Sequence, residues 1–288
     1  MVYDGAIMSI LAGLSSRRVR KIVFPLIVAG VMLLVWHGAV RLTGSDLFPT
    51  PAEVLKGTME LARPVPAIEP GTPWHRWPIE YLEHSRLVRY IVASLFRVTV
   101  GFTLALIIGI PFGLLLGWST RLFDAFNPII QVLRPISPIA WIPVAILWFG
   151  VDDRSPIFLI FLASVFPITV AAMAAVQNMQ LVYVRAARNF GLSKPQLFAR
   201  VIFPACLPQI LTGVRIALGV AWLVVVAAEM IAVNSGLGFL IIDARNAGKR
   251  YDLVVAGMAL IGLIGLVLDL LVRRLERFDE VRWGYASR

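Results

Sequence analysis

Charged side chains are scarce in this sequence. Asp, Glu, Lys and Arg make up 15% of its 288 residues, while hydrophobic residues make up 59% and the mean hydropathy is +0.81. Soluble domains carry about 25% charged residues, and a chain with far fewer cannot cover a surface that faces water. The composition therefore argues against a soluble enzyme and predicts an integral membrane protein.

Residues that hold metals, nucleotides or disulfides are also few. Cys206 is the only cysteine, which excludes an intrachain disulfide and a site with several thiolate ligands. The three histidines, His37, His75 and His84, form no pair at helical spacing. No GxxxxGK(S/T) phosphate-binding loop occurs, and no nucleophile and base are paired as an enzyme would need. We expect no catalytic residue, metal site or cofactor on this chain.

Six apolar stretches are long enough to cross a bilayer core of about 30 Å, which needs roughly 20 helical residues. They cover residues 22–42, 91–117, 124–149, 156–178, 209–233 and 253–273. The predicted fold is therefore an all-α integral membrane protein with six transmembrane helices. We attribute the net charge of +10 to basic cytoplasmic loops rather than to nucleic-acid binding.

Lys and Arg are concentrated in the segments that face the cytoplasm if the N-terminus lies there. A basic cluster at 17–21 precedes the first span, and no small-residue cleavage site follows that span closely. We therefore expect a retained anchor rather than a signal peptide. By the positive-inside rule, the N-terminal segment 1–21 and the tail 276–288 are both predicted to be cytoplasmic.

The first loop, residues 43–90, is long and is predicted to lie outside the cytoplasm. After Pro49-Thr50-Pro51, the stretch from Ala52 to Ala62 mixes apolar and polar residues and is expected to form a helix along the membrane surface. A proline-rich stretch with two tryptophans follows at 64–78, which is typical of an irregular loop in the headgroup zone. The other five spans form a core at 91–275.

Small residues recur at every fourth position of the second span. They are Gly101, Ala105, Gly109, Gly113 and Gly117. Such a stripe lets a neighbouring helix approach closely, because van der Waals contact drives helix association in lipid. We interpret it as a packing surface.

Three prolines interrupt the third span between Arg134 and Pro143, in the sequence RPISPIAWIP. Each proline removes an amide donor and disfavours a helical conformation in the residue before it. Carbonyls freed at membrane depth are tolerated only inside protein or beside a water-filled cavity. The span is therefore either a kinked structural helix or the lining of a path, with Ser137 and Trp141 near mid-depth.

Charged residues within the spans are expected to form pairs, because an isolated charge costs about 2.5–3.5 kcal/mol at the bilayer centre. On the predicted topology Arg97 and Glu229 share the outer half, and Arg215 and Asp269 share the inner half. Each pair is either a structural clamp or a gate. Arg134 has no evident acidic partner, which makes it the better candidate to meet an anion. The candidate path residues are Arg134, Ser137, Trp141 and Glu229.

The polar segment between the fourth and fifth spans is predicted to form two short cytoplasmic helices. Residues 183–190 favour a helix, with Gly191 as its left-handed cap. Ser193 begins a capping box at the start of a second helix, which Pro204 and Pro208 are expected to end. The basic residues and apolar ridge of this segment indicate a docking surface for a cytoplasmic partner. The alternative is an amphipathic helix bound to anionic lipid.

The run RAARNFG, from Arg185 to Gly191, resembles the EAA loop of binding-protein-dependent ABC import permeases, with arginine in place of the glutamate of that motif. The similarity extends over about 90–275. It includes the segments 94–97, 134–143, 227–230, 236–238 and 268–269. The chain is most similar to the nitrate, sulfonate, taurine and bicarbonate branch of these permeases.

The resemblance implies that residues 183–203 form a coupling loop in a groove of a separate ATPase subunit. The residues implied in this contact are Arg185, Ala186, Ala187, Arg188, Gly191, Ser193, Gln196 and Arg200. It also implies a homodimer in the bacterial inner membrane, two ATPase subunits that bind ATP and Mg, and an extracytoplasmic substrate-binding protein. Such a dimer would import a small anion such as nitrate, bicarbonate, a sulfonate or taurine. The alternative is a partner-independent secondary transporter or channel for a small solute.

Overall fold

The computed structural model describes residues 17–44, 48–63 and 85–275, which are mostly helical. In chain order the helical elements are α2 (Arg17–Thr43), α3 (Pro51–Ala62), α5 (Arg86–Trp118), α6 (Thr120–Leu133), a 3₁₀ turn (Pro138–Trp141), α7 (Ile142–Phe149), α8 (Arg154–Gln177), α9 (Leu181–Asn189), α10 (Lys194–Leu197), a π-helical turn (Phe198–Ile202), α11 (Phe203–Ala232), α12 (Leu237–Gly248) and α13 (Tyr251–Leu275). The proline-rich stretch 64–78, the tail 276–288 and most of the N-terminal segment lie outside the described residues.

The helices have the lengths and hydropathy of a multi-pass membrane protein. Five of the described helices, in α2, α5, α8, α11 and α13, are long and apolar enough to cross a membrane. Helix α6 and the segment Pro138–Phe149 are long and apolar enough to cross a membrane only when they are taken together. The two segments are bent by 83° relative to each other. The prediction of an all-α fold with six apolar stretches is confirmed, but the stretch 124–149 is not one helix.

Prolines explain the break in that third stretch. Helix α6 ends at Leu133, and Ser137 has ψ 129°, the extended conformation that a following proline favours. Pro138 and Pro143 then occupy the first turns of the 3₁₀ turn and of α7. In a first turn the missing amide has no helical partner to lose, so both prolines start new segments. The result is two short helices that change direction, rather than one kinked span.

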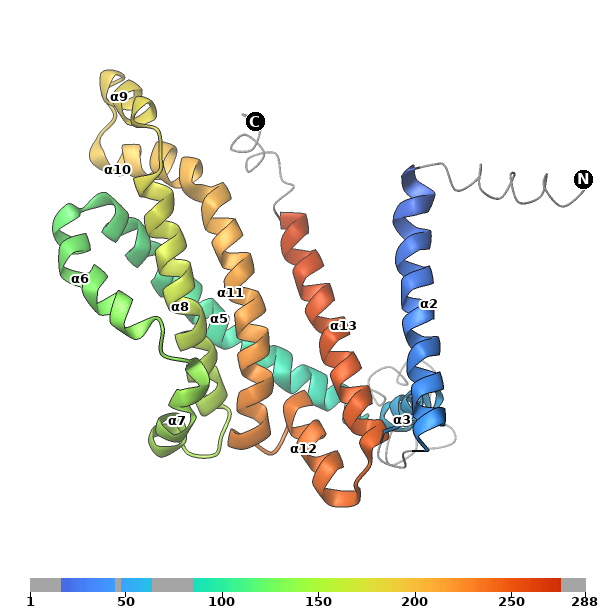
Figure 1. Ribbon diagram of the computed structural model, residues 1–288. Helices are drawn as coiled ribbons and strands as arrows, with labels where there is room; N and C mark the ends of the chain where they lie inside the picture. Colours follow the sequence, from blue (N-terminus) through green and yellow to red (C-terminus); the bar gives the residue numbers. More distant parts are fainter. Residues whose placement is uncertain (1–16, 45–47, 64–84, 276–288) are drawn as a thin grey trace, which may run out of the picture.

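Helix α8 packs against both α5 and α11 (Figure 1). The small-residue stripe of α5 makes the first of these contacts. A Cβ atom added at Gly101 would lie 2.7 Å from the carbonyl oxygen of Ile157, and one added at Gly117 would lie 2.6 Å from that of Met173. The two backbones therefore approach too closely for larger side chains, which makes the predicted packing surface a contact with α8.

The two ends of the molecule differ in what they carry. The loop with α9 and α10 lies at the same end as the start of α2 and the end of α13, whereas α3, α7 and α12 lie at the opposite end (Figure 1). Helix α2 contacts α3, and no residue in the most apolar stretch of α2 is buried. Its apolar side chains are therefore available to contact lipid.

The second helix of the polar segment does not end at Pro204 and Pro208, as the sequence had predicted. Instead α10 continues through the π-helical turn Phe198–Ile202 into α11. The amide of Phe203 donates to the carbonyl of Phe198, five residues earlier, and Pro204 follows in the first turn of α11. A wider turn followed by a first-turn proline loses few hydrogen bonds, so the helix continues.

Candidate functional site

A buried cluster of charges joins α5 to α11. Arg97 on α5 and Glu229 on α11 are 1% and 0% exposed, and Nη1 of Arg97 lies 2.7 Å from Oε1 of Glu229. Asp153, in the turn before α8, accepts hydrogen bonds from Nη2 and Nε of Arg97 at 2.6 and 2.9 Å. The guanidinium therefore bridges two carboxylates, and this pairing offsets the large cost of burying its charge.

The turn between α11 and α12 closes over the Glu229 carboxylate. The amide of Gly238 donates to Oε2 of Glu229 at 3.0 Å, and the hydroxyl of Ser94 donates to the same oxygen at 2.8 Å. Gly236 has φ +105°, a conformation that L residues rarely adopt, and a Cβ atom there would collide with the carboxylate. Glycine is therefore required where the backbone passes over the buried charge.

The structure brings Arg97 and Glu229 together, as their shared depth predicted. Sequence reasoning missed Asp153 and Ser235, because both lie in turns, where no periodic pattern marks them. The carbonyl and hydroxyl of Ser235 complete a set of five hydrogen bonds from Arg97. A guanidinium has five N–H donors, so none remains for a ligand. This geometry favours a clamp over a gate.

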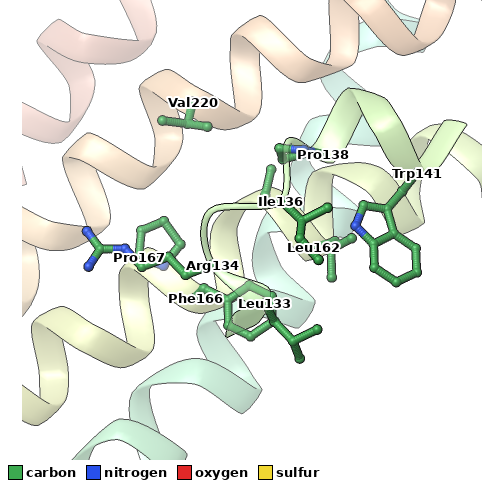
Figure 2. Close-up of a pocket in the computed structure, with 10 residues that line it drawn as sticks. Leu133, Arg134, Ile136, Pro138, Trp141, Leu162, Phe166, Pro167 and Val220 are labelled. Atoms are coloured by element: carbon green, nitrogen blue, oxygen red, sulfur yellow. The ribbon is translucent and has the colours of Figure 1, made fainter. Parts of the chain in front are cut away.

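A cavity of about 230 Å³ lies against the break in the third stretch (Figure 2). It is lined by Leu133, Arg134, Ile136, Pro138, Trp141, Leu162, Ala163, Phe166, Pro167 and Val220. Arg134 is the one charged lining residue, and it forms no ion pair with any residue that the structure describes. Figure 2 shows its guanidinium and the Trp141 indole on opposite sides of the apolar residues. A mostly apolar cavity with one cation can accept a small anion.

The predicted path residues are divided between two places. Arg134 and Trp141 line the cavity at the break. Ser137 lies between them in the chain, with an exposed side chain, but is not a lining residue. Glu229 does not line this cavity. Its carboxylate binds the guanidinium of Arg97 instead.

A second ion pair joins α11 to α13, and it is the other pair that shared depth predicted. Arg215 Nε lies 2.7 Å from Oδ1 of Asp269, and Arg215 Nη2 lies 3.2 Å from its Oδ2. Arg273, one turn further along α13, places Nε 2.9 Å from Oδ2 of Asp269. These side chains are about one-third to one-half exposed, so the pair is less sheltered than the Arg97 clamp.

The α9–α10 surface, which we define as residues 181–200, is basic on its exposed side. Val184 and Ala187 are buried and hold α9 against the hydrophobic core. Arg185 and Arg188 are exposed on the same helix. Of the other residues that the resemblance implied, the exposed ones are Ala186, Gly191, Ser193, Gln196 and Arg200.

The local structure of this surface follows the predicted capping signals. Gly191 has φ +71°, the left-handed conformation expected after α9. The amide of Ser193 donates to Oε1 of Gln196 at 3.0 Å, which is one half of the capping box that starts α10. Phe190, between the two helices, is 83% exposed. The loop thus presents an exposed aromatic side chain between its two short helices.

At the opposite end, Arg250 ties α3 to the turn between α12 and α13. Its Nη2 lies 2.7 Å from Oε2 of Glu60 and 2.8 Å from Oδ2 of Asp252. The hydrogen bond from Arg250 lowers the pKa of Glu60, and the two carboxylates raise the pKa of Arg250. Sequence reasoning did not anticipate this contact, because 190 positions separate Glu60 from Arg250. Among the described residues, no group of three or more His, Cys, Asp or Glu could hold a metal ion.

Residues 109–278 match the family described as "Binding-protein-dependent transport system inner membrane component". The match covers more than half of the chain. The chain belongs to this family of ABC importer permeases. Membership agrees with the loop at 183–203 and with the apolar helices described above, and it places the protein among multi-pass inner membrane proteins.

Curated relatives place this permease in the branch that the sequence motifs indicated, and that prediction is confirmed. It is 36% identical to the taurine transport system permease protein TauC of Escherichia coli, over 90% of this chain and 89% of TauC. It is 37% identical to the nitrate import permease protein NrtB of Synechocystis sp., over 89% of this chain and 88% of NrtB. Identity to the bicarbonate transport system permease protein CmpB of Synechococcus elongatus is 39%, over 65% of this chain and 67% of CmpB.

Solved structures share the fold of this permease at low identity. A chain of the inward-facing MetNI methionine ABC transporter superposes with a TM-score of 0.58 and 20% identity, covering 69% of this permease and 97% of that chain. A chain of a bacterial alginate ABC transporter superposes with a TM-score of 0.56 and 13% identity, covering 92% and 96%. The helical arrangement is therefore that of ABC importer permeases.

Proposed function

We propose that two copies of this permease form the path of a small anion across the bacterial inner membrane. Two ATPase subunits, which bind ATP and Mg²⁺, would engage the α9–α10 surface, and an extracytoplasmic binding protein would deliver the anion at the opposite end. The observation that carries the proposal is the exposed basic α9–α10 surface at one end of a chain of this family. Nothing in this mechanism requires a nucleotide site on the permease itself.

A continuous helical connection supports mechanical coupling between that surface and the path. Helical structure runs without a break from Lys194 through the π-helical turn to Ala232. The same helix lines the cavity with Val220 and carries Glu229. Closure of the ATPase subunits on ATP would displace both loops and rock the two permeases between inward- and outward-facing states.

The assignment of path residues rests on the cavity at the break. Arg134 would meet the anion, Trp141 would form the facing wall, and Ser137 would line the path beside them. Glu229 would act indirectly, since its carboxylate holds Arg97 and thereby fixes α11 against α5. The substrates named for the relatives, nitrate, bicarbonate and taurine, support a small anion or sulfonate as the substrate.

The orientation follows from placing the ATPase contact in the cytoplasm. Because the start of α2 and the end of α13 lie at the same end as α9 and α10, both termini would also be cytoplasmic (Figure 1). Helix α3 and the turn between α12 and α13 would then face the binding protein. The positive-inside rule supports the same orientation.

A partner-independent secondary transporter or channel is the competing function. Such a protein couples transport to ions through acidic residues near mid-depth. In this chain Glu229 and Asp269 are both held by arginines. This pairing favours a permease that takes its energy from a separate ATPase.

Purification of the tagged full-length chain from its native membrane in mild detergent tests the proposal. We expect an ATPase subunit to co-purify, identified by mass spectrometry, and the complex to hydrolyse ATP. Gly191→Val, which strains a left-handed position, should abolish hydrolysis, whereas Gly30→Ala on α2, where a Cβ atom meets nothing within 4 Å, should preserve it. A stable chain recovered alone and without hydrolysis would overturn the proposal in favour of partner-free transport.

The path assignment has a separate test in the reconstituted transporter. Arg134→Glu should abolish anion uptake while ATPase co-purification continues, because the reversed charge repels the anion at the cavity. Arg134→Lys should retain part of the uptake, since it keeps the cation but not the planar guanidinium. The co-purified binding protein can be screened against nitrate, bicarbonate, sulfonates and taurine to identify the substrate.

A further inference from the structure

The α9–α10 surface carries positive charge that its own surroundings do not neutralise. Its four cations are exposed, and none of them forms an ion pair with another residue that the structure describes. They are Arg185, Arg188, Lys194 and Arg200. From Arg154 to Ala228 the sequence contains no Asp or Glu, so the loop has no acidic residue of its own.

An aromatic side chain stands among these cations. Phe190 is 83% exposed, and Tyr183 and Leu181 on the same helix are 50% and 65% exposed. Aromatic residues are enriched in protein–protein interfaces, so an exposed phenylalanine between two helices is a suitable anchor for a protein partner. A partner that fits this surface needs an apolar socket with negative charge around it.

The mixed exposed side of α9 and its position argue against a lipid surface as the occupant. An interfacial amphipathic helix turns its apolar face to the lipid. In α9 Val184 and Ala187 pack into the hydrophobic core, and the exposed side mixes Arg185 and Arg188 with Leu181 and Tyr183 rather than forming one apolar face. Helix α9 also lies beyond the ends of α8 and α11, at the tip of the molecule (Figure 1).

We propose that the α9–α10 surface fits a carboxylate-lined groove of the ATPase subunit, with an apolar socket for Phe190. The inference rests on the proposed function and adds the chemistry of the partner. Arg185 occupies the position at which the EAA motif has glutamate, so it would select an ATPase with an acidic groove and reject one with a basic groove. Specificity of this kind combines attraction to one partner with repulsion of another.

The test measures binding of the co-purifying ATPase subunit to the full-length permease in nanodiscs of phosphatidylcholine, which carries no net charge. Arg185→Glu should weaken binding about tenfold and should flatten its dependence on salt, because it replaces an attraction with a repulsion. Lys56→Glu is the matched control. It makes the same charge change at an exposed cation of α3, at the opposite end, and should alter affinity less than about twofold.

A compensating change separates a specific pair from a general loss of charge. Cross-linking from position 185 identifies the facing carboxylate of the ATPase, and its replacement by arginine should restore the binding of the Arg185→Glu permease. Phe190→Ala should weaken binding without changing its salt dependence. Size-exclusion profiles matching the wild type would show that these exposed substitutions leave the permease folded.

The outcomes distinguish the inference from the function on which it rests. If Arg185→Glu binds the ATPase as tightly as the wild type, the acidic groove is wrong while the ABC permease function stands. If Arg185→Glu loses binding only to vesicles of phosphatidylglycerol and keeps its ATPase, the surface binds lipid and the inference is overturned. If the wild-type chain retains no ATPase at all, the proposed function fails and the inference fails with it.

Discussion

Each hydrogen bond to Glu229 adds to the cost of replacing this residue. Its carboxylate accepts from Ser94, Arg97 and Gly238, and the residue is fully buried. Removing one partner of a buried ion pair leaves the other charge uncompensated, at a cost of about 3–5 kcal/mol. We expect Glu229→Ala and Arg97→Ala each to lower the free energy of unfolding by this amount.

A double-mutant cycle checks that the two residues act as a pair. In reversible unfolding in mixed micelles, the double variant should lose far less than the sum of the two single losses, because the second substitution removes the orphaned charge. Additive losses would show that Arg97 and Glu229 stabilise the fold independently.

Gly236 is the residue whose backbone makes room for that carboxylate. Gly236→Ala would combine a φ of +105° with a Cβ atom against Glu229, and the backbone strain alone costs about 1–3 kcal/mol. Gly262→Ala on α13 is the control, since its Cβ atom meets nothing within 4 Å and alanine favours helix by about 1 kcal/mol. The melting temperature should fall for Gly236→Ala, and it should stay the same or rise for Gly262→Ala.

At the scale of helices, the contact between α5 and α8 depends on the absence of side chains. Gly117→Ala would place a Cβ atom 2.6 Å from the carbonyl oxygen of Met173, so the helices must separate. Overpacking of this kind costs about 1–3 kcal/mol. Gly38→Ala on α2, where a Cβ atom has open space, should cost nothing. Equal melting temperatures for the two variants would contradict the close contact.

The contact of Arg250 with Glu60, which holds α3 to the turn between α12 and α13, should depend on pH. Hydrogen bonding to Arg250 lowers the pKa of Glu60 below its ordinary value of 4.5. A carboxyl whose pKa is lowered by folding contributes stability at neutral pH, and that contribution is lost as the pH falls through the lowered value. We therefore expect α3 amides to lose hydrogen-exchange protection below pH 4.5, after correction for intrinsic rates. Arg250→Gln should weaken protection at neutral pH and reduce this acid dependence, leaving the part that comes from Glu53, whose pKa is lowered by its hydrogen bonds to Thr50 in the capping box of α3.

The elements that sequence reasoning could predict were those with a continuous pattern. Hydropathy marks α5, α8, α11 and α13 because each is a long apolar run, and the glycine stripe marks the packing face of α5. Prolines indicated a disturbance near 134–143, but the 83° bend depends on which neighbours each short helix meets. Pro204 and Pro208 were wrongly predicted to end a helix, because the sequence pattern does not show the π-helical turn that precedes them.

The candidate site was predictable only where two residues share a depth. Arg97 and Glu229 could be paired in this way, because the predicted topology places the start of the second span and the end of the fifth span at the same depth. Asp153 and Ser235 lie in turns, where neither hydropathy nor spacing gives a position in three dimensions. The same limit applies to Glu60 and Arg250. Contacts between distant loops require the fold itself.

At the scale of the whole molecule, the two ends have different tasks in the proposed mechanism, and their orientation can be measured. Cys206 is buried and is the only cysteine of the chain, so Cys206→Ala supplies a background without reactive thiols. In that background Phe190→Cys reports the α9–α10 end, and Arg245→Cys on α12 reports the opposite end.

A membrane-impermeant maleimide applied to intact spheroplasts should label the chain with Arg245→Cys and spare the chain with Phe190→Cys. After permeabilisation and removal of bound ATPase subunits both should react, which shows that the protected site is accessible once the membrane is open. The opposite pattern would place the α9–α10 surface outside the cytoplasm, where no ATP is available to an ATPase partner. Because each variant carries a single thiol at one end of the chain, comparison of the two distinguishes inversion from a general loss of structure, in which both sites would be labelled before permeabilisation.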